Sequence, residues 1–175
     1  MRFKRSDLAK MFAEKGFTKG AEIGVRYGNF SRVLCETNSK LELKSVDPYR
    51  ELYSAPETQA WGNKKLDKVF RYATNILSPY NCEIIRKTSL DASLDIENES
   101  LDFVYIDGSH EFDYVMTDIV LWGWKVKKGG IISGHDYSKT HWGVRLAVDT
   151  YAKAHEAKIN LTEELTPSWW IERTW

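Results

Sequence analysis

Two short apolar segments of the chain are each followed at once by aspartate and histidine. Asp107 and His110 follow the first segment, and His135 and Asp136 follow the second. A carboxylate and an imidazole together can move a proton or hold a metal ion, because the first is an anion and the second titrates near neutrality. These four residues are the first candidates for chemistry, provided that the fold brings them together.

A strand, a helix and a second strand would bring them together. The apolar residues at 103–106 and 131–132 are typical of strands buried in a parallel sheet. Between them, residues 112–126 carry apolar side chains three and four positions apart, which predicts a helix that covers the sheet. A right-handed crossover puts both strand ends on one edge, where α/β proteins bind their ligands.

The rest of the chain also alternates strands with helices, and no internal repeat is present. The alternation predicts one domain, residues 1–175, with a doubly wound and mainly parallel sheet. The further elements expected are a helix at 5–16, a strand, glycine turn and helix at 20–35, a strand at 41–47, an insertion with one helix at 49–80, a strand at 82–87, a helix at 141–157, and closing strands at 158–163 and 168–175.

Composition argues against several classes of function. Lys plus Arg and Asp plus Glu are 25 each, so the net charge is zero and no field attracts nucleic acid or an anionic membrane. No stretch has the ~18 apolar residues of a membrane span, and no signal-peptide core follows the N-terminus. Cys35 and Cys82 lack metal-site spacing and are interpreted as buried free thiols. We expect a cytoplasmic protein.

A glycine turn follows the first predicted strand of the alternating core. Gly24 and Gly28 do not form the G-x-G-x-x-G pattern that cradles a diphosphate. Glu22, just before the turn, would repel a diphosphate but suits a cofactor that carries an ammonium or sulfonium cation. Asp47 ends the next strand, where an acid reaches a bound ribose in dinucleotide folds. The pattern favours S-adenosylmethionine over a nicotinamide dinucleotide.

Taken together, these features resemble the class I S-adenosylmethionine-dependent methyltransferases, over about residues 18–155. Within that class the chain is similar to the small methyltransferase domain family 24, on the motifs Ile-Asp-Gly-Ser-His ending at His110, Trp122, Gly129-Gly130, and Gly-His-Asp-Tyr ending at Tyr137. The resemblance implies a Rossmann-like three-layer α/β sandwich. Its seven-stranded sheet would be mainly parallel, with an antiparallel last strand.

The resemblance also implies a cofactor site. The glycine turn would pass under the methionine and ribose groups, Glu22 would lie near the amino group, and Asp47 would accept hydrogen bonds from the ribose hydroxyls. Ser89 and Leu90 would flank the adenine. The predicted cofactor-binding residues are Glu22, Gly24, Arg26, Tyr27, Gly28, Asn29, Asp47, Ser89, Leu90 and Asp107.

The implied reaction is methyl transfer to a hydroxyl group of a small molecule such as a sugar. The acceptor must lose a proton, so His110 is the predicted general base, and Asp107 is placed with it as catalytic. Asp107 and Asp136 are also predicted ligands of Mg²⁺ or another divalent cation, as in related sugar O-methyltransferases. His135 stands where those enzymes have a further acid, and Mg²⁺ prefers oxygen ligands, so metal use stays open.

Alternatives remain at this point. One is an S-adenosylmethionine-binding module with little activity alone, because acids common in the related enzymes are replaced at Ser109 and His135. Another is a nicotinamide oxidoreductase. His141 and Trp142 are candidates for the acceptor pocket, and Trp61 is a candidate for that pocket or for a lid. Exposed tryptophans would also favour a homodimer.

Overall fold

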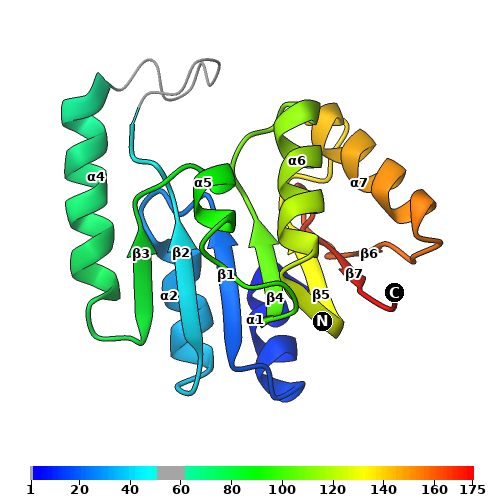
Figure 1. The fold of residues 1–175 in the computed structure, drawn as a ribbon, viewed down its shortest axis with the longest axis horizontal. Helices are drawn as coiled ribbons and strands as arrows, with labels where there is room; N and C mark the ends of the chain where they lie inside the picture. The colour runs from blue at the N-terminus through cyan, green and yellow to red at the C-terminus, as the bar shows by residue number, and fades with distance from the viewer. Residues whose placement is uncertain (1, 51–61) are drawn as a thin grey trace.

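The computed structural model describes residues 2–50 and 62–175, and they form one seven-stranded sheet with helices on both faces (Figure 1). The strand order is β3-β2-β1-β4-β5-β7-β6. The strands are β1 (Lys19–Ile23), β2 (Glu42–Val46), β3 (Cys82–Ile85), β4 (Leu101–Ile106), β5 (Val126–Gly134), β6 (Asn160–Leu161) and β7 (Trp169–Glu172). The first five pair in parallel and β7 is antiparallel to β5, which confirms the predicted Rossmann-like sheet.

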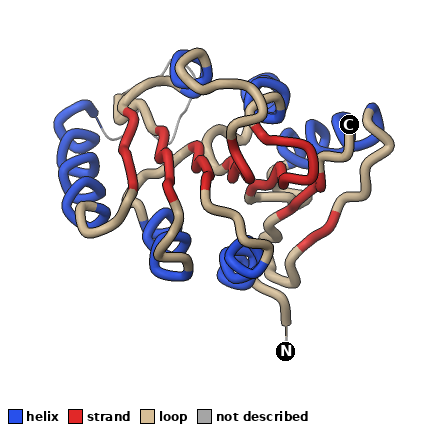
Figure 2. Tube along the Cα trace, turned by 60° about the horizontal axis from the view of Figure 1, so that its bottom comes forward, coloured by secondary structure: helices blue, strands red, loops and turns tan. Residues whose placement is uncertain are grey.

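Helices cover the sheet on both sides, as Figure 2 shows. One face packs against α1 and α2 through a core that includes Phe12, Phe30 and Phe103, and the other packs against α5, α6 and α7 through Ile119, Trp122 and Val148. The helices are α1 (Arg5–Glu14), α2 (Asn29–Thr37), α4 (Gly62–Leu77), α5 (Ser89–Ser93), α6 (Phe112–Gly123) and α7 (Trp142–Ala154). The three-layer sandwich that the family resemblance implies is therefore present.

The centre of the sheet is the predicted crossover of β4, α6 and β5. Every residue of β4 is buried, as the unbroken apolar and aromatic run requires of a central parallel strand. The expected helix to residue 126 was too long, because α6 ends at Gly123 and Val126 is the first residue of β5, paired with Leu101. The apolar spacing continues across this boundary, so periodicity alone could not locate the turn.

Segments outside this centre match the expectations less closely. The closing strands are present but short, four residues in β7 and two in β6. The insertion at 49–80 contains α4, while Trp61 lies outside the described residues. No helix in the described part of the chain is long and apolar enough to cross a membrane. The fold therefore leaves the carboxyl ends of β1, β2, β4 and β5 on one edge, where the candidate site lies.

Candidate active site

A close backbone contact joins the ends of β1 and β4. Gly24 has φ +90°, and a Cβ atom built there would lie 2.2 Å from the carbonyl oxygen of Asp107. Glycine is required at this position because a side chain would collide with that backbone and strain its own. The contact puts the glycine turn directly beside the strand end that carries Asp107.

Asp47, at the end of β2, holds the glycine turn from the other side. Its Oδ2 accepts the N–H groups of Val25 (3.1 Å) and Arg26 (2.9 Å), and its Oδ1 accepts that of Tyr49 (2.8 Å). Burial raises the pKa of Asp47, and these three N–H groups oppose that rise. Two carboxylate oxygens can accept about four hydrogen bonds, so Asp47 retains capacity for a ligand.

The remaining turn residues lie between β1 and α4. Arg26 is exposed with φ +50°, and the ring of Tyr27 meets that of Tyr72 edge to face, with centroids 5.9 Å apart. Gly28 takes a left-handed conformation directly before Asn29, the exposed first residue of α2. The turn is thus a compact connection between β1 and α2 that also contacts α4 through Tyr27 and Gly28.

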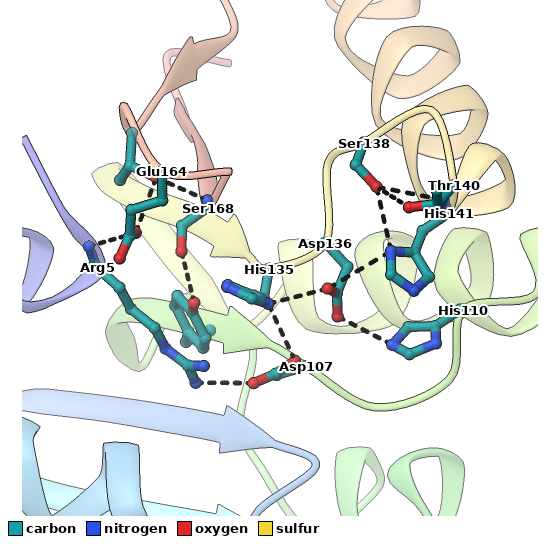
Figure 3. A network of polar contacts seen from close by, with 12 residues as sticks. Arg5, Asp107, His110, His135, Asp136, Ser138, Thr140, His141, Glu164 and Ser168 are labelled. Atoms are coloured by element: carbon teal, nitrogen blue, oxygen red, sulfur yellow. Dashed lines mark hydrogen bonds and ion pairs between the residues drawn. The ribbon is translucent and has the colours of Figure 1, made fainter. Parts of the chain in front are cut away.

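An arginine lies between the two carboxylates expected at the methionine end of a cofactor. Nη2 of Arg5, the first residue of α1, lies 2.7 Å from Oδ2 of Asp107 (Figure 3). The same atom lies 3.8 Å from Oε1 of Glu22. The guanidinium lies over the ring of Phe30, at 4.1 Å from its centroid. Its Nε is buried and has no hydrogen-bond partner among the described residues. Sequence analysis missed Arg5 because nothing local shows that α1 begins at this edge.

The two carboxylates differ in charge. Glu22 is fully buried and accepts a hydrogen bond from the Ser31 hydroxyl, and burial raises its pKa to about 8. Burial also raises the pKa of Asp107, but the positive charge of Arg5 and the neighbouring His135 oppose that rise. Glu22 is therefore largely protonated at neutral pH, and Asp107 is the anionic partner of Arg5.

Three imidazoles meet one carboxylate, that of Asp136 (Figure 3). His110 Nε2 lies 2.9 Å from its Oδ2, while His135 Nδ1 and His141 Nδ1 lie 3.1 and 3.6 Å from its Oδ1. Burial alone would raise the pKa of Asp136, but hydrogen bonds from His110 and His135 outweigh burial and lower it well below the usual range. Asp136 therefore stays ionised at neutral pH.

The backbone explains how His110 and His141 meet. A Cβ atom at Gly143, in the first turn of α7, would lie 2.5 Å from the carbonyl oxygen of His110. The start of α7 therefore packs directly on the loop after β4, and the two imidazole centroids are 4.4 Å apart.

Asp136 adopts φ +61°, a left-handed conformation that aspartate tolerates better than most residues. His135 lies 3.9 Å from Asp107, so both predicted pairs share one rim.

Ser89 and Leu90 remain predicted neighbours of the adenine, and the structure gives the side chain of Ser89 a further contact. The Ser89 hydroxyl donates to Asp118 and accepts the Trp122 indole N–H (2.8 Å), both on α6, while Leu90 is 53 % exposed. Burial raises the pKa of Asp118 to about 6. Sequence analysis missed Asp118, although an acid on the apolar stripe of a predicted helix was a usable signal. The side chain of Ser89 fastens α5 to α6.

Two hollows flank these residues. A cavity of about 300 Å³ opens beside Asp47, between the ends of β2 and β3. It is lined by Pro48, Arg50, Arg86, Lys87, Thr88 and Asp91. A second cavity, of about 10 Å³, lies among Asp107, His110, His135 and Asp136. Such a volume holds about one water molecule or ion.

The sheet order and the ligand-binding edge define the architecture of a class I S-adenosylmethionine-dependent methyltransferase. A family model described as a methyltransferase domain matches residues 21–137, from β1 to the residue after Asp136. The chain belongs to this methyltransferase family. The match leaves out α1, and with it Arg5, as well as α7, β6 and β7.

Solved structures with the same fold are distant in sequence. An O-methyltransferase from Bacillus cereus, in complex with SAH, is 13 % identical, with a TM-score of 0.72 over 97 % of this chain and 80 % of that one. The O-methyltransferase TomG from Streptomyces achromogenes, in complex with SAM, is 12 % identical, with a TM-score of 0.74 over 98 % and 79 %. A putative rRNA-methylase from Clostridium thermocellum is 12 % identical, with a TM-score of 0.72 over 100 % and 98 %. No curated protein matches the sequence.

Proposed function

We propose that this methyltransferase transfers the methyl group of S-adenosylmethionine to a hydroxyl group of a small molecule such as a sugar. The observation that carries the proposal is the pairing of two sites on one edge. The Arg5–Asp107 pair lies beside the glycine turn, and the His110–Asp136 pair lies beside Asp107. The first suits the methionine end of the cofactor, and the second suits the removal of a proton from the acceptor.

The charges at the first pair fit the cofactor. The methionine end carries an ammonium and a carboxylate, and the site offers the carboxylate of Asp107 and the guanidinium of Arg5. A ligand carboxylate would also give the buried Nε of Arg5 the acceptor that the described residues do not provide. Asp47 would receive the ribose hydroxyls, and the turn from Gly24 to Asn29 would lie beneath the ligand.

The second pair performs the acid–base part of the reaction. When bound, the cofactor supplies an electrophilic methyl group on a sulfonium. With Nε2–H of His110 donated to Asp136, the lone pair of Nδ1 takes the proton of the acceptor hydroxyl. Ionised Asp136 then stabilises the imidazolium that results. Asp107 orients Arg5 and faces the reacting end, so its catalytic role is positional.

Magnesium at Asp107 and Asp136 stays a prediction, and the donor set fits it poorly. The cation of Arg5 already lies 2.7 Å from Asp107, and the imidazole of His135 lies between the two aspartates. A second cation there would be repelled by Arg5, and Mg²⁺ prefers oxygen ligands to imidazole. We therefore assign no step of the reaction to magnesium. The cytoplasmic location and the homodimer likewise stay predictions.

Two other functions are tested alongside. A binding module with little activity alone would bind the cofactor but turn over no acceptor. An RNA acceptor is raised by the Clostridium thermocellum neighbour, which is named a putative rRNA-methylase. A net charge of zero argues against RNA, because phosphate contacts carry most of the affinity for nucleic acids.

The first experiment is a thermal-shift and calorimetric titration with S-adenosylmethionine, S-adenosylhomocysteine and NAD. At a concentration of 100 Kd, a ligand adds about 2.7 kcal/mol to the free energy of unfolding. Arg5→Gln and Asp47→Asn should weaken binding of the adenosyl compounds, whereas Asp95→Asn, an exposed carboxylate beside Lys87, is the matched control. A response to NAD alone would overturn the proposal.

The second experiment measures the release of S-adenosylhomocysteine with a panel of sugars and phenols, and separately with RNA. Turnover with a hydroxyl compound, lost in His110→Gln, supports the proposal. Cofactor binding without turnover of any acceptor would favour the binding module. Turnover with RNA alone would show that the acceptor class is wrong.

A further inference from the structure

We propose that His110, Asp136 and His141 form a binding site for a divalent transition-metal ion such as Zn²⁺, which shares Asp136 with the predicted magnesium site but has two imidazoles in place of Asp107. One donor atom from each of these three side chains lies within 4.8 Å of the other two. Two imidazoles and one carboxylate are a ligand set that zinc and iron take, with further positions left open.

The spacing of the donor atoms fits such an ion. Tetrahedral coordination at about 2.0–2.1 Å places neighbouring ligand atoms about 3.3 Å apart. The separations here are 2.9 Å from His110 Nε2 to Asp136 Oδ2 and 3.6 Å from His141 Nδ1 to Asp136 Oδ1. Small rotations of the side chains would therefore admit an ion without movement of the backbone. The cavity of about 10 Å³ beside His110 and Asp136 leaves room for one further ligand.

The backbone holds these ligands in place. Gly143 lets the start of α7 approach the carbonyl oxygen of His110, which brings His141 to the loop after β4. Asp136 reaches both imidazoles from a left-handed conformation (φ +61°) that few residues other than glycine adopt. Nδ1 of His141 also lies 3.1 Å from the Ser138 hydroxyl, a contact that the ion would replace because both use the lone pair of this nitrogen.

Charge distinguishes this cluster from the neighbouring one. Asp107, His135 and Asp136 also lie close enough to share an ion, but Arg5 forms an ion pair with Asp107. On α7, Arg145 lies about one turn after His141, but its guanidinium pairs with Asp149 at 3.6 Å and lies over the ring of Tyr137. A metal ion at His110, Asp136 and His141 therefore meets a carboxylate that is not already paired with arginine.

Metal binding does not depend on the proposed methyl transfer. A role of the ion in catalysis would depend on the proposed function, because an ion beside the acceptor would lower the pKa of the acceptor hydroxyl. His110 would then serve as a ligand, because Nε2 cannot hold the ion and donate a proton to Asp136 at once. The binding test below contains no methyl donor, so its failure and the failure of the proposed function are separate results.

The test is a titration of the chelator-treated full chain, without a polyhistidine tag, with Co²⁺ followed by visible absorption. We expect one equivalent of Co²⁺ to bind, to be displaced by Zn²⁺, and to persist in excess Mg²⁺. His110→Ala and His141→Ala should each weaken binding by about tenfold or more. His155→Ala is the matched control, because His155 stacks on Trp175 at 4.0 Å, away from the cluster.

His135→Ala decides between the two clusters. Binding that survives His135→Ala and is lost in His141→Ala supports the proposal. If binding is lost in His135→Ala and kept in His141→Ala, the ion binds at the Asp107 cluster instead. If no saturable binding is seen, there is no metal site here. Either result overturns the proposal. Should a variant fail to fold by circular dichroism, X-ray absorption of the zinc-loaded natural chain replaces it. Two imidazole nitrogens at about 2.0–2.1 Å are expected there, and one or none contradicts the site.

Discussion

At the scale of single residues, the site depends on one carboxylate that stays charged and another that does not. Asp136 is kept ionised by His110 and His135, while Glu22 is buried and has its pKa raised to about 8. At neutral pH, Asp136 is therefore ionised, while Glu22 on the same edge of the sheet is largely neutral.

Removing the base should slow catalysis without affecting the cofactor. His110→Gln takes away the group that accepts the proton, so we expect the turnover rate to fall by roughly 10²–10⁴-fold. The dissociation constant for S-adenosylhomocysteine should remain within a few-fold, because the cofactor is expected beside the glycine turn whereas His110 pairs with Asp136. Single-turnover rates and calorimetry measure the two quantities. An unchanged rate would remove His110 from the mechanism.

Glu22 should make stability depend on pH in a defined direction. Its pKa is about 8 in the folded state against an ordinary value of 4.5, so the folded chain binds more protons between these values. The free energy of unfolding should therefore fall as pH rises through that window. Urea unfolding without ligand at about pH 6 and pH 8 should show a smaller fall for Glu22→Gln than for the natural chain. Glu83→Gln, an exposed acid on β3, is the control, and equal falls would contradict the prediction.

Residue types predicted part of this site. Asp107, His110, His135 and Asp136 could be placed together because strand ends of a parallel crossover share an edge. Arg5 could not, because its place depends on how α1 docks on the sheet. The contact of the Ser89 hydroxyl with α6 could not be predicted either, because it depends on packing that sequence spacing does not encode.

At the scale of secondary-structure elements, the approach of α7 to the loop after β4 determines the acceptor side. Gly143→Ala should push these segments apart, because the added methyl group would lie 2.5 Å from the His110 carbonyl oxygen. We expect a loss of roughly 1–3 kcal/mol in the free energy of unfolding. We also expect methyl transfer to fall more than cofactor affinity, since α7 packs on the loop that carries His110. Lys153→Ala, exposed on the same helix, should change neither quantity.

Sequence periodicity found the elements but not all of their ends. The strands of the core and the helices α1, α4, α6 and α7 lie where apolar spacing predicted them. The boundary near Val126 was misplaced, because a β-branched residue at the start of a strand also continued the stripe of the preceding helix. Hydrogen bonding across strands, which decides such boundaries, is not visible in a single segment.

At the scale of the whole molecule, segments outside the family match complete the core. Trp169 and Ile171 of β7 are fully buried against β5, and Phe12 of α1 packs on Phe103 with ring centroids 4.3 Å apart. The exposed Trp124 and Trp142 lie at opposite ends of the sheet layer, after α6 and at the start of α7. Among the residues that the structure describes, they do not form one shared patch, and the homodimer stays a prediction.

Deleting residues 160–175 should leave β5 as an open edge strand. The pairs Ile131–Glu172 and Ile132–Ile171 would be lost, and an unpaired apolar edge favours aggregation. We expect little soluble protein and loss of the cooperative thermal transition. Deletion of residues 174–175 alone leaves β7 intact and serves as the control. A soluble, cooperatively folding product of the longer deletion would show that β7 is dispensable.

The backbone contacts of Gly24 and Gly143 have a consequence for how this sequence can vary. Neither glycine touches a ligand through a side chain, yet a single methyl group at either position meets a carbonyl oxygen at 2.2 or 2.5 Å. In a library of all single substitutions, these two positions should therefore tolerate less change than the exposed turn residues Arg26 and Asn29. New acceptor specificity is better sought at Trp142, an exposed candidate for the acceptor pocket, because the two glycines fix the backbone on which both halves of the site are built.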